Sequence, residues 1–517
     1  AASDVYKRQG KTTLTEKFLL FGGAINTAGS VKGKANSKYA VSDWMDIEKE
    51  RGISVTSSVL QFNYDGYCIN ILDTPGHQDF SEDTYRTLMA ADSAVMVIDA
   101  SKGVEAQTIK LFKVCVMRHI PIFTFINKMD RDARDTFELL DDIETVLGIK
   151  TCPVNWPIGS GKEFKGVYDR KTKIVSTFQA ISTGGAKKAE ETDYHIDDEA
   201  LKELVGPYLF DQFNEEIELI DGATEEMDIE KVRAGELSPV FFGSALNTFG
   251  IEQFLNYFLK MTTPPIGRNS SEGIIDPVTE PFSAFVFKIQ ANMNKAHRDR
   301  IAFMRICSGK FEAGMEVYHA ASKRKIKLSQ PQQLMAQDRK IVDEAYAGDV
   351  IGVFDPDLFS IGDTLTTGGK KFEYEGIPTF APEHFCRVVQ LNSMKRKQFV
   401  KGVTQIAQEG AIQIFQEYTA GLSEIIVGVV GVLQFDVLKY RLENEYGCEI
   451  RLEPIPYNYI RWVKDPTIDV TKLKRVSDVK KVKDMKGNPL LLFANEWVID
   501  QVLQHNEGLE LEEFRKN

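Results

Sequence analysis

The chain of 517 residues has few cysteines and no long apolar run. Its six cysteines are scattered, with no C-x-x-C pair and no histidine cluster nearby, so we expect small buried thiols in a reducing compartment rather than disulfides or a zinc site. No apolar run reaches the length of a membrane span, and the N-terminus lacks the pattern of a signal peptide. We therefore expect a cytoplasmic protein without a membrane partner.

An excess of positive charge is also missing. The 63 Lys and Arg residues are outnumbered by 75 Asp and Glu residues, which gives a net charge of −12. This balance argues against a protein that coats nucleic acid with its whole surface, so any such contact must come from local basic stretches. Two candidates are residues 322–327 and 393–402, although each is by itself most simply a solubilising surface.

Residues 11 to about 260 alternate short apolar runs with segments of helical periodicity. Continuous apolar runs are typical of strands that are buried on both faces of a parallel sheet. The pattern predicts an α/β domain over 1–262, doubly wound around a mostly parallel sheet. The runs lie at 68–72, 93–100, 120–127 and 238–245, and the clearest helical segments at 110–120 and 134–148.

The sequence pattern changes twice in the rest of the chain. Residues 261–281 are rich in Pro, Gly and Ser and are predicted to be a linker. Short strands punctuated by glycine then predict a β-barrel domain over 281–380. Residues 381–517 are predicted to form an α+β domain, in which 423–455 has the pattern strand, helix, strand. A charged run at 472–486 is most simply the solvated face of a helix.

Gly10-Lys11-Thr12 matches the end of a phosphate-binding loop, which reads G-x-x-x-x-G-K-[ST] after an apolar strand. The motif alone is weak evidence, because nothing before Gly10 has the pattern of a strand. Its weight comes from four further elements that follow in order in the same predicted domain.

The first is Asp73-Thr74-Pro75-Gly76, directly after the run 68–72. An aspartate at the carboxyl end of such a strand can hold Mg²⁺ through water, and the glycine amide can reach a γ-phosphate. Alone, this segment would be most simply a turn capped by aspartate. His77 follows, where an imidazole could orient the water that attacks the γ-phosphate.

The second is Asn127-Lys128-Met129-Asp130, which ends the run 120–127. The Asp130 carboxylate can accept from N1–H and the 2-amino group of guanine, and Asn127 can reach the other edge. Adenine would leave Asp130 facing a lone pair, and a buried charge without a partner is costly.

The last two elements are weaker. Ser244-Ala245-Leu246 directly follows SPVFFG (238–243) and could bring a backbone amide to guanine O6. Ser54, in the segment 51–54, could give its hydroxyl to Mg²⁺ only while the γ-phosphate is present, which would make the segment a sensor. Five elements in the expected order predict a GTP-binding domain.

The segments DTPGHQDF, KERGIS and NKMD, with the three-part layout, resemble the translation factor GTPases, the group that includes elongation factor G. Three longer stretches are similar to the bacterial peptide chain release factor 3 family: SDWMDIEKERGISVTSSVLQF, LDTPGHQDFSEDTYRTL and FVFKIQANMNKAHRDRIAFMRICSGKF. The resemblance runs from Gly10 to the C-terminus. It implies a monomeric, ribosome-stimulated GTPase that uses GTP and Mg²⁺, contacts ribosomal RNA and proteins, and drives codon-reading (class one) release factors off the ribosome after peptide release, whichever stop codon was read.

The resemblance also implies roles for single residues. Lys11 would contact the β- and γ-phosphates, Thr12 would bind Mg²⁺, and Thr13 would lie nearer the α-phosphate. Asp73 would hold the metal's water, Gly76 would sense the γ-phosphate, and His77 would position the attacking water. Asn127, Lys128 and Asp130 would bind guanine.

Two absences favour this family. We expect no translocase, because the chain has no room for the two further domains of that class. We also expect that the protein does not cleave the peptide itself, because it lacks the Gly-Gly-Gln tip of the codon-reading release factors. A non-hydrolysing ribosome-binding module and an elongation factor G-like translocase remain the alternatives.

The start of the chain departs from the family's loop, which reads like H-x-D-x-G-K-T. Arg8 stands in the place of the aspartate, and bulky Tyr6 and Lys7 stand where the backbone must approach phosphate. We expect residues 1–9 to be a foreign or misassembled end that replaces a central first strand. This predicts lower stability, and weaker GTP binding than a version with an intact loop would show.

Overall fold

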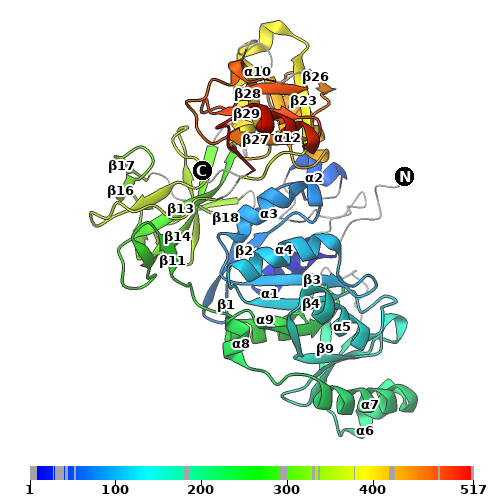
Figure 1. Ribbon diagram of the computed structural model, residues 1–517. Helices are drawn as coiled ribbons and strands as arrows, with labels where there is room; N and C mark the ends of the chain where they lie inside the picture. Colours follow the sequence, from blue (N-terminus) through cyan, green and yellow to red (C-terminus); the bar gives the residue numbers. More distant parts are fainter. Residues whose placement is uncertain are drawn as a thin grey trace. The chain divides into compact units, whose positions relative to one another are not determined.

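The computed structural model describes residues 9–26, 28, 40, 45–51, 54–179, 187–291, 300–328, 332–335, 338–377, 379–418, 425–474 and 478–513. The chain divides into two compact units (Figure 1). The first unit comprises Ala1–His77, Ala90–Ile266 and Leu334–Arg339, and the second comprises Gln78–Met89, Gly267–Gln333 and Lys340–Asn517. Most of residues 1–9, for which a replaced first strand was expected, lie outside the described residues.

A parallel sheet with the strand order β3-β4-β10-β5 forms the centre of the first unit. Its strands are β3 (Ala94–Asp99), β4 (Ile122–Asn127), β10 (Leu237–Phe242) and β5 (Lys150–Pro153). Every residue of β4 and β10 is buried, as expected for continuous apolar runs in a parallel sheet. The structure thus confirms the predicted α/β domain and three of its four predicted parallel strands.

The fourth predicted strand, at 68–72, is a strand of another kind. It is β2 (Tyr67–Asp73), which pairs antiparallel with β1 (Ser58–Tyr64) in a two-stranded sheet. Asp65 and Gly66 both have positive φ and close a two-residue hairpin between the two strands. In the described part of the chain β2 pairs with no parallel strand, so the prediction of a fully buried parallel strand is wrong here. Cys68 lies exposed on β2, whereas the other five cysteines are buried as expected.

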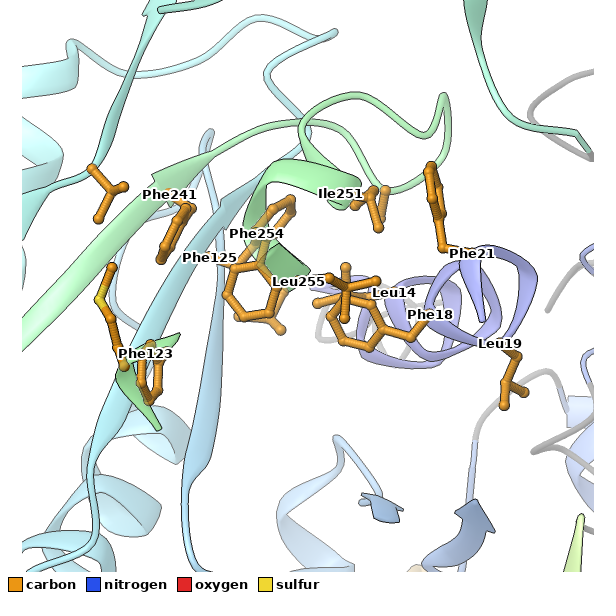
Figure 2. Packing of buried hydrophobic residues seen from close by; sticks show 14 of the residues in the cluster. Leu14, Phe18, Leu19, Phe21, Phe123, Phe125, Phe241, Ile251, Phe254 and Leu255 are labelled. Atoms are coloured by element: carbon orange, nitrogen blue, oxygen red, sulfur yellow. The ribbon is translucent and has the colours of Figure 1, made fainter. Parts of the chain in front are cut away.

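Helices α1 (Lys11–Phe21) and α9 (Ile251–Met261) build the aromatic core of the first unit (Figure 2). The Phe254 ring of α9 stacks on Phe18 of α1 at a centroid distance of 5.5 Å. It also meets Phe125 of β4 at 5.7 Å and Phe241 of β10 at 4.9 Å. Helix α1, which begins directly after Gly10, is therefore packed against the same core as the two central strands.

The helical segments predicted at 110–120 and 134–148 correspond to α4 (Ala106–Met117) and α5 (Thr136–Leu147). Asp135 caps α5 by accepting from the amides of Phe137 and Glu138, and Gly148 ends the helix in the left-handed region. An additional antiparallel sheet and three helices between β5 and β10 were not predicted: β6 (Asn155–Ile158), β7 (Gly166–Asp169), β8 (Ile174–Gln179), β9 (Glu190–His195), α6 (Glu199–Val205), α7 (Pro207–Ala223) and α8 (Ile229–Arg233). The unit also contains α2 (Asp46–Arg51) and η2 (Gly161–Glu163).

In the second unit, the predicted barrel is built on the long buried strands β13 (Ser283–Ala291) and β14 (Arg300–Ser308). The other strands of this region that lie wholly in the unit are β15 (Lys310–Glu312), β16 (Glu316–His319), β17 (Arg324–Lys327), β20 (Glu344–Tyr346), β21 (Val350–Phe354) and β22 (Thr364–Thr366). Strands β18 (Gln332–Met335) and β19 (Asp338–Ile341) belong in part to the first unit, which includes Leu334–Arg339. The predicted linker is not wholly irregular, because it contains the hairpin β11 (Arg268–Ser270) and β12 (Gly273–Ile275).

The predicted α+β region contains an eight-stranded sheet with the order β26-β23-β25-β24-β28-β29-β27-β30. The pattern predicted at 423–455 is found as β25 (Ile425–Val429), α11 (Leu433–Asn444) and β26 (Ile450–Pro454). Residues 475–477 of the charged run lie outside the described residues, and the rest is not a helix face, since its centre forms β28 (Val479–Lys483) with Val479 and Val482 buried. The other elements are β23 (His384–Gln390), η3 (Ser393–Lys395), α10 (Arg396–Gln408), β24 (Gln413–Glu417), β27 (Tyr459–Val463), η5 (Val470–Lys472), β29 (Pro489–Phe493), α12 (Glu496–His505) and β30 (Leu511–Glu512).

A short piece from early in the sequence also belongs to the second unit, namely η1 (Gln78–Phe80) with α3 (Ser81–Leu88). The Arg86 guanidinium donates to the Gly410 carbonyl at 3.0 Å, and the Leu433 amide donates to Asp79 Oδ2 at 2.8 Å. A Cβ on Gly410 would lie 2.0 Å from Arg86 Nη1, so the close approach depends on glycine.

No helix in the described ranges is long and apolar enough to cross a membrane.

Candidate functional site

The candidate phosphate site begins where α1 begins. Gly10 has a φ of 102°, in the left-handed region that favours glycine. A Cβ at this position would lie 2.3 Å from Asn127 Nδ2, so a larger residue would collide with the side chain at the end of β4. The first turn of α1 carries no acidic residue, which leaves the positive end of the helix dipole available to an anion.

Lys11, the first residue of α1, lies beside Gly76. A Cβ on Gly76 would be 2.9 Å from Lys11 Nζ. Burial lowers the pKa of Lys11, and the carboxylates of Asp73 and Glu105 oppose that shift. The structure therefore brings together the ends of the two motifs that were predicted to grip the γ-phosphate.

Two of the three predicted metal ligands lie side by side. The hydroxyls of Thr12 and Ser54 lie 3.2 Å apart, and Asp73 at the end of β2 is buried. Among the described residues no three His, Cys, Asp or Glu side chains form a metal-binding group. Two hydroxyls and one carboxylate nevertheless fit Mg²⁺, which takes oxygen ligands and usually keeps several waters. Gly52 and Ile53 of the predicted sensor segment lie outside the described residues.

Asn127 holds three loops together. Its Nδ2 donates to the Gln9 carbonyl at 2.8 Å, and its Oδ1 accepts from the amides of Lys128 and Ala245 at 2.8 Å each. The side chain is 2% exposed. Both of its polar atoms bind protein groups in the structure, while Nδ2 carries two N–H groups and, among the described residues, donates only one of them, to Gln9. That Asn127 also reaches an edge of guanine stays a prediction. The side chain links the phosphate loop to the two loops after β4 and β10.

Asp130 is placed differently. Its Oδ1 is buried and has no hydrogen-bond partner among the described residues. Since a buried acceptor without a partner is costly, this oxygen fits a ligand that brings an N–H group, as guanine does. The Met129 amide anchors the same loop by donating to the Gly243 carbonyl at 3.1 Å.

Lys128 has a φ of 74°, which is rare for a residue with a side chain. Its ammonium pairs with Asp99, at the end of the neighbouring strand β3. Burial opposes ionisation of Asp99, but the hydrogen bonds from Lys128 and Ser101 outweigh it and lower the pKa of that carboxyl. Sequence reasoning missed Asp99, although its position at the carboxyl end of a predicted strand was a usable signal.

The other predicted nucleotide-binding residues differ in how far they are buried. Ser244 and Ala245 are fully buried, while Leu246 is 45% exposed. Because the Ala245 amide already binds Asn127, the Leu246 amide is the candidate for guanine O6. Buried Pro75 and the partly buried Thr13, Thr74 and His77 are found in the same two motifs as Lys11 and Gly76.

Sequence reasoning also missed a contact between the phosphate loop and α4. Gln9 Nε2 donates to Glu105 Oε2 at 2.8 Å and to Thr108 Oγ1 at 3.2 Å. The two partners are about a hundred residues away from Gln9 in the chain, so no local spacing could have revealed them.

Three family models match the chain. The Elongation factor Tu GTP binding domain matches residues 8–264, and Elongation factor G domain 2 matches 281–368. The model described as Class II release factor RF3, C-terminal domain, matches 374–503.

Curated relatives agree with these matches over nearly the whole chain. A protein from Symbiobacterium thermophilum named Peptide chain release factor 3 is 56% identical over 500 residues, which cover 97% of this chain and 94% of that protein. Proteins of the same name from Synechococcus elongatus and Gloeothece citriformis are 53% and 51% identical over 97% of this chain, covering 90% and 93% of their own lengths. The chain belongs to the peptide chain release factor 3 family.

A solved structure also shares the fold of this release factor 3 family member. A crystal structure of a protein from Thermus thermophilus matches with a TM-score of 0.69 and 21% identity, over 92% of this chain and 70% of that one. Membership of the release factor 3 family, together with the GTP-binding domain, identifies a translational GTPase that binds guanine nucleotide and acts in translation termination.

Proposed function

We propose that the chain is a ribosome-stimulated GTPase that promotes dissociation of class one release factors from the ribosome after peptide release, whichever stop codon was read. The observation that supports this most is the buried Oδ1 of Asp130, which has no protein partner in the described part of the chain. Guanine supplies N1–H and a 2-amino group to such an oxygen, whereas adenine supplies neither. The names of the relatives support the step in translation.

The triphosphate binds between the start of α1 and the segment after β2. Lys11 contacts the β- and γ-phosphates, and Thr13 lies nearer the α-phosphate. The Gly76 amide contacts the γ-phosphate. This assignment is supported by the short approach between Gly76 and Lys11 Nζ and by the acid-free first turn of α1.

Thr12, Ser54 and Asp73 would hold Mg²⁺, with Asp73 acting through a water molecule. The ion would supply positive charge that offsets the negative charge developing during phosphoryl transfer. His77 orients the attacking water once the ribosome has brought its imidazole into place. Ser54 engages only while a γ-phosphate is present, so its segment reports which nucleotide is bound.

The protein acts as a monomer on the ribosome and contacts ribosomal RNA through local basic surfaces. Residues 322–327 and 393–402 supply lysines that are exposed, such as Lys325 and Lys397. Contacts of this kind with phosphate weaken as the salt concentration rises.

The decisive experiment has two parts. The first measures GTP turnover with and without ribosomes. The second follows the release of a fluorescently labelled class one release factor from ribosomes whose peptide has already been released. We expect ribosomes to accelerate turnover, and GTP to speed the loss of the factor at every stop codon. The variant His77→Ala should still bind GTP but lose on the order of a hundredfold of the stimulated turnover. The exposed His505 provides the matched control, His505→Ala.

Ribosomes that leave turnover unchanged would refute the enzymatic part of the proposal and favour a ribosome-binding module. A factor that remains bound despite hydrolysis would refute the recycling part. Movement of mRNA in a translocation assay would instead indicate a translocase.

A further inference from the structure

Asp99 has no place among the nucleotide contacts proposed above, yet it joins two loops at the site. It ends β3, and the register of the sheet places it opposite Asn127 at the end of β4. Its carboxylate is buried, and its two oxygens have separate partners. Oδ1 accepts from the amide and the hydroxyl of Ser101 at 3.0 and 2.7 Å, and Oδ2 pairs with the Lys128 ammonium. The carboxylate therefore ties the loop after β3 to the loop after β4.

The shape of the loop after β4 depends on Lys128. Its φ of 74° is unfavourable for a residue with a side chain, and such strain persists only where the surroundings hold it. Two main-chain contacts help to do so. The Lys128 amide donates to Asn127 Oδ1 at 2.8 Å, and the Lys128 carbonyl accepts from the Arg131 amide at 3.0 Å, which closes the turn that contains Asp130. The ion pair with Asp99 adds a hold on the Lys128 side chain.

The ion pair also limits what Lys128 can offer to a nucleotide. Its side chain is 22% exposed, and its charge is compensated by a carboxylate whose side chain is only 4% exposed. Oδ1 of Asp130, by contrast, is buried and has no hydrogen-bond partner in the described part of the chain. Hydrogen bonds weaken steeply as their angle departs from linear, so a small shift of this loop would harm base recognition in particular.

We propose that Asp99 is a positioning residue for base recognition, which acts through Lys128 to hold the Asp130 carboxylate where it accepts from both N1–H and the 2-amino group of guanine. The inference rests on the proposed guanine site at Asp130. A carboxylate that merely stabilised the fold would affect the binding of every nucleotide equally. Asp99 instead affects most strongly the nucleotide that makes the most contacts with Asp130.

The test compares the affinities of the full chain for GTP and for inosine triphosphate, whose base keeps N1–H but lacks the 2-amino group. The unaltered chain should bind GTP at least about tenfold more tightly, because the 2-amino group donates to a charged oxygen. In Asp99→Asn the ratio of the two affinities should fall to about threefold or less. Asparagine keeps nearly the same volume and an acceptor for Ser101, which protects the fold.

A second variant tests whether Asp99 acts through Lys128. Lys128→Met keeps an unbranched side chain but removes the ion pair, so it should lower the affinity ratio to the same extent as Asp99→Asn. The double variant should lower the ratio no further, because two residues that act through one contact are not additive.

Asp142→Asn is the matched control. Oδ2 of Asp142 also accepts from a backbone amide, that of Val104 at 2.9 Å, and from a cation, Arg134 Nη1 at 3.1 Å. This variant should leave the affinity ratio unchanged even where a urea titration shows lower stability. An unchanged ratio in Asp99→Asn, or a further fall in the double variant, would overturn the inference and leave the guanine site intact. If the unaltered chain bound both nucleotides equally, the guanine site and the inference would fall together.

Discussion

Replacing Asp130 by asparagine should change which base the protein binds. The aspartate offers two acceptor oxygens, whereas the asparagine amide offers one acceptor and one donor. Guanine presents two donors at this edge, so one of them would face the NH₂ group of the new side chain. Xanthine presents N1–H beside a carbonyl oxygen and matches the amide instead. Asp130→Asn should therefore bind GTP poorly and xanthosine triphosphate well.

The size of the effect follows from the state of Asp130 Oδ1, which is buried and has no hydrogen-bond partner in the described residues. Losing a hydrogen bond to a charged group costs about 1.5–3 kcal/mol, and leaving the 2-amino group unpaired costs about 1–3 kcal/mol more. At about 1.4 kcal/mol per tenfold change in affinity, GTP binding should weaken by roughly two to four orders of magnitude.

Equilibrium titration with fluorescent GTP and xanthosine triphosphate measures both affinities on the full chain. Asp132 lies two residues further on and is exposed, so Asp132→Asn is the control and should bind GTP normally. If Asp130→Asn kept its GTP affinity, or gained none for the xanthine nucleotide, Asp130 would not be the group that contacts the base.

Three further predictions concern stability. Asn127→Ala removes three hydrogen bonds and should lower the free energy of unfolding of the nucleotide-free protein by about 3 kcal/mol in a urea titration. Gly410→Ala places a Cβ 2.0 Å from Arg86 Nη1 at a residue whose φ is 75°. It should lower the free energy of unfolding by about 2–4 kcal/mol, which a thermal melt would show as a lower midpoint. Gly222→Ala on helix α7 is the control, because its Cβ has free space, and its midpoint should be equal or higher. Burial lowers the pKa of Lys17 to about 8, so the cost of its charge is fully present below pH 8 and disappears as the pH rises towards 10.5. Lys17→Met should be more stable than the unaltered chain at pH 7, by up to about 3 kcal/mol, and urea midpoints should show this advantage vanish between about pH 8 and pH 10.

The parallel strands could be predicted because their burial leaves a simple trace in the sequence. β4 and β10 are covered on both faces, so most of their residues are apolar. The prediction that β2 is a parallel strand was wrong because an apolar run does not reveal which strand it pairs with, or in which direction. The Asp65-Gly66 pair before it is a hairpin signal that would have indicated the antiparallel pairing with β1. β28 was missed because lysines dominate its sequence while only Val479 and Val482 mark its buried side.

The site could be predicted in outline because motifs at the carboxyl ends of parallel strands meet at one edge of the sheet. This explains why the loop with Asp130 was foreseen as a unit. The contacts of Asn127 with the protein could not be foreseen, since they depend on where the Gln9 carbonyl and the Ala245 amide lie in the folded chain. The contact of Glu105 with Gln9 likewise exists only in the folded chain.

The membership of α3 in the second unit means that neither unit is an unbroken length of polypeptide. A fragment that began at Gly267 would inherit the barrel strands and the C-terminal sheet but not this helix. The Gly410 carbonyl would lose Arg86, and Arg268 would lose the Met89 carbonyl to which it donates at 2.7 Å. Dissecting this protein at the apparent border between its sequence domains would therefore remove a supporting helix, and autonomous folding of the pieces should not be assumed.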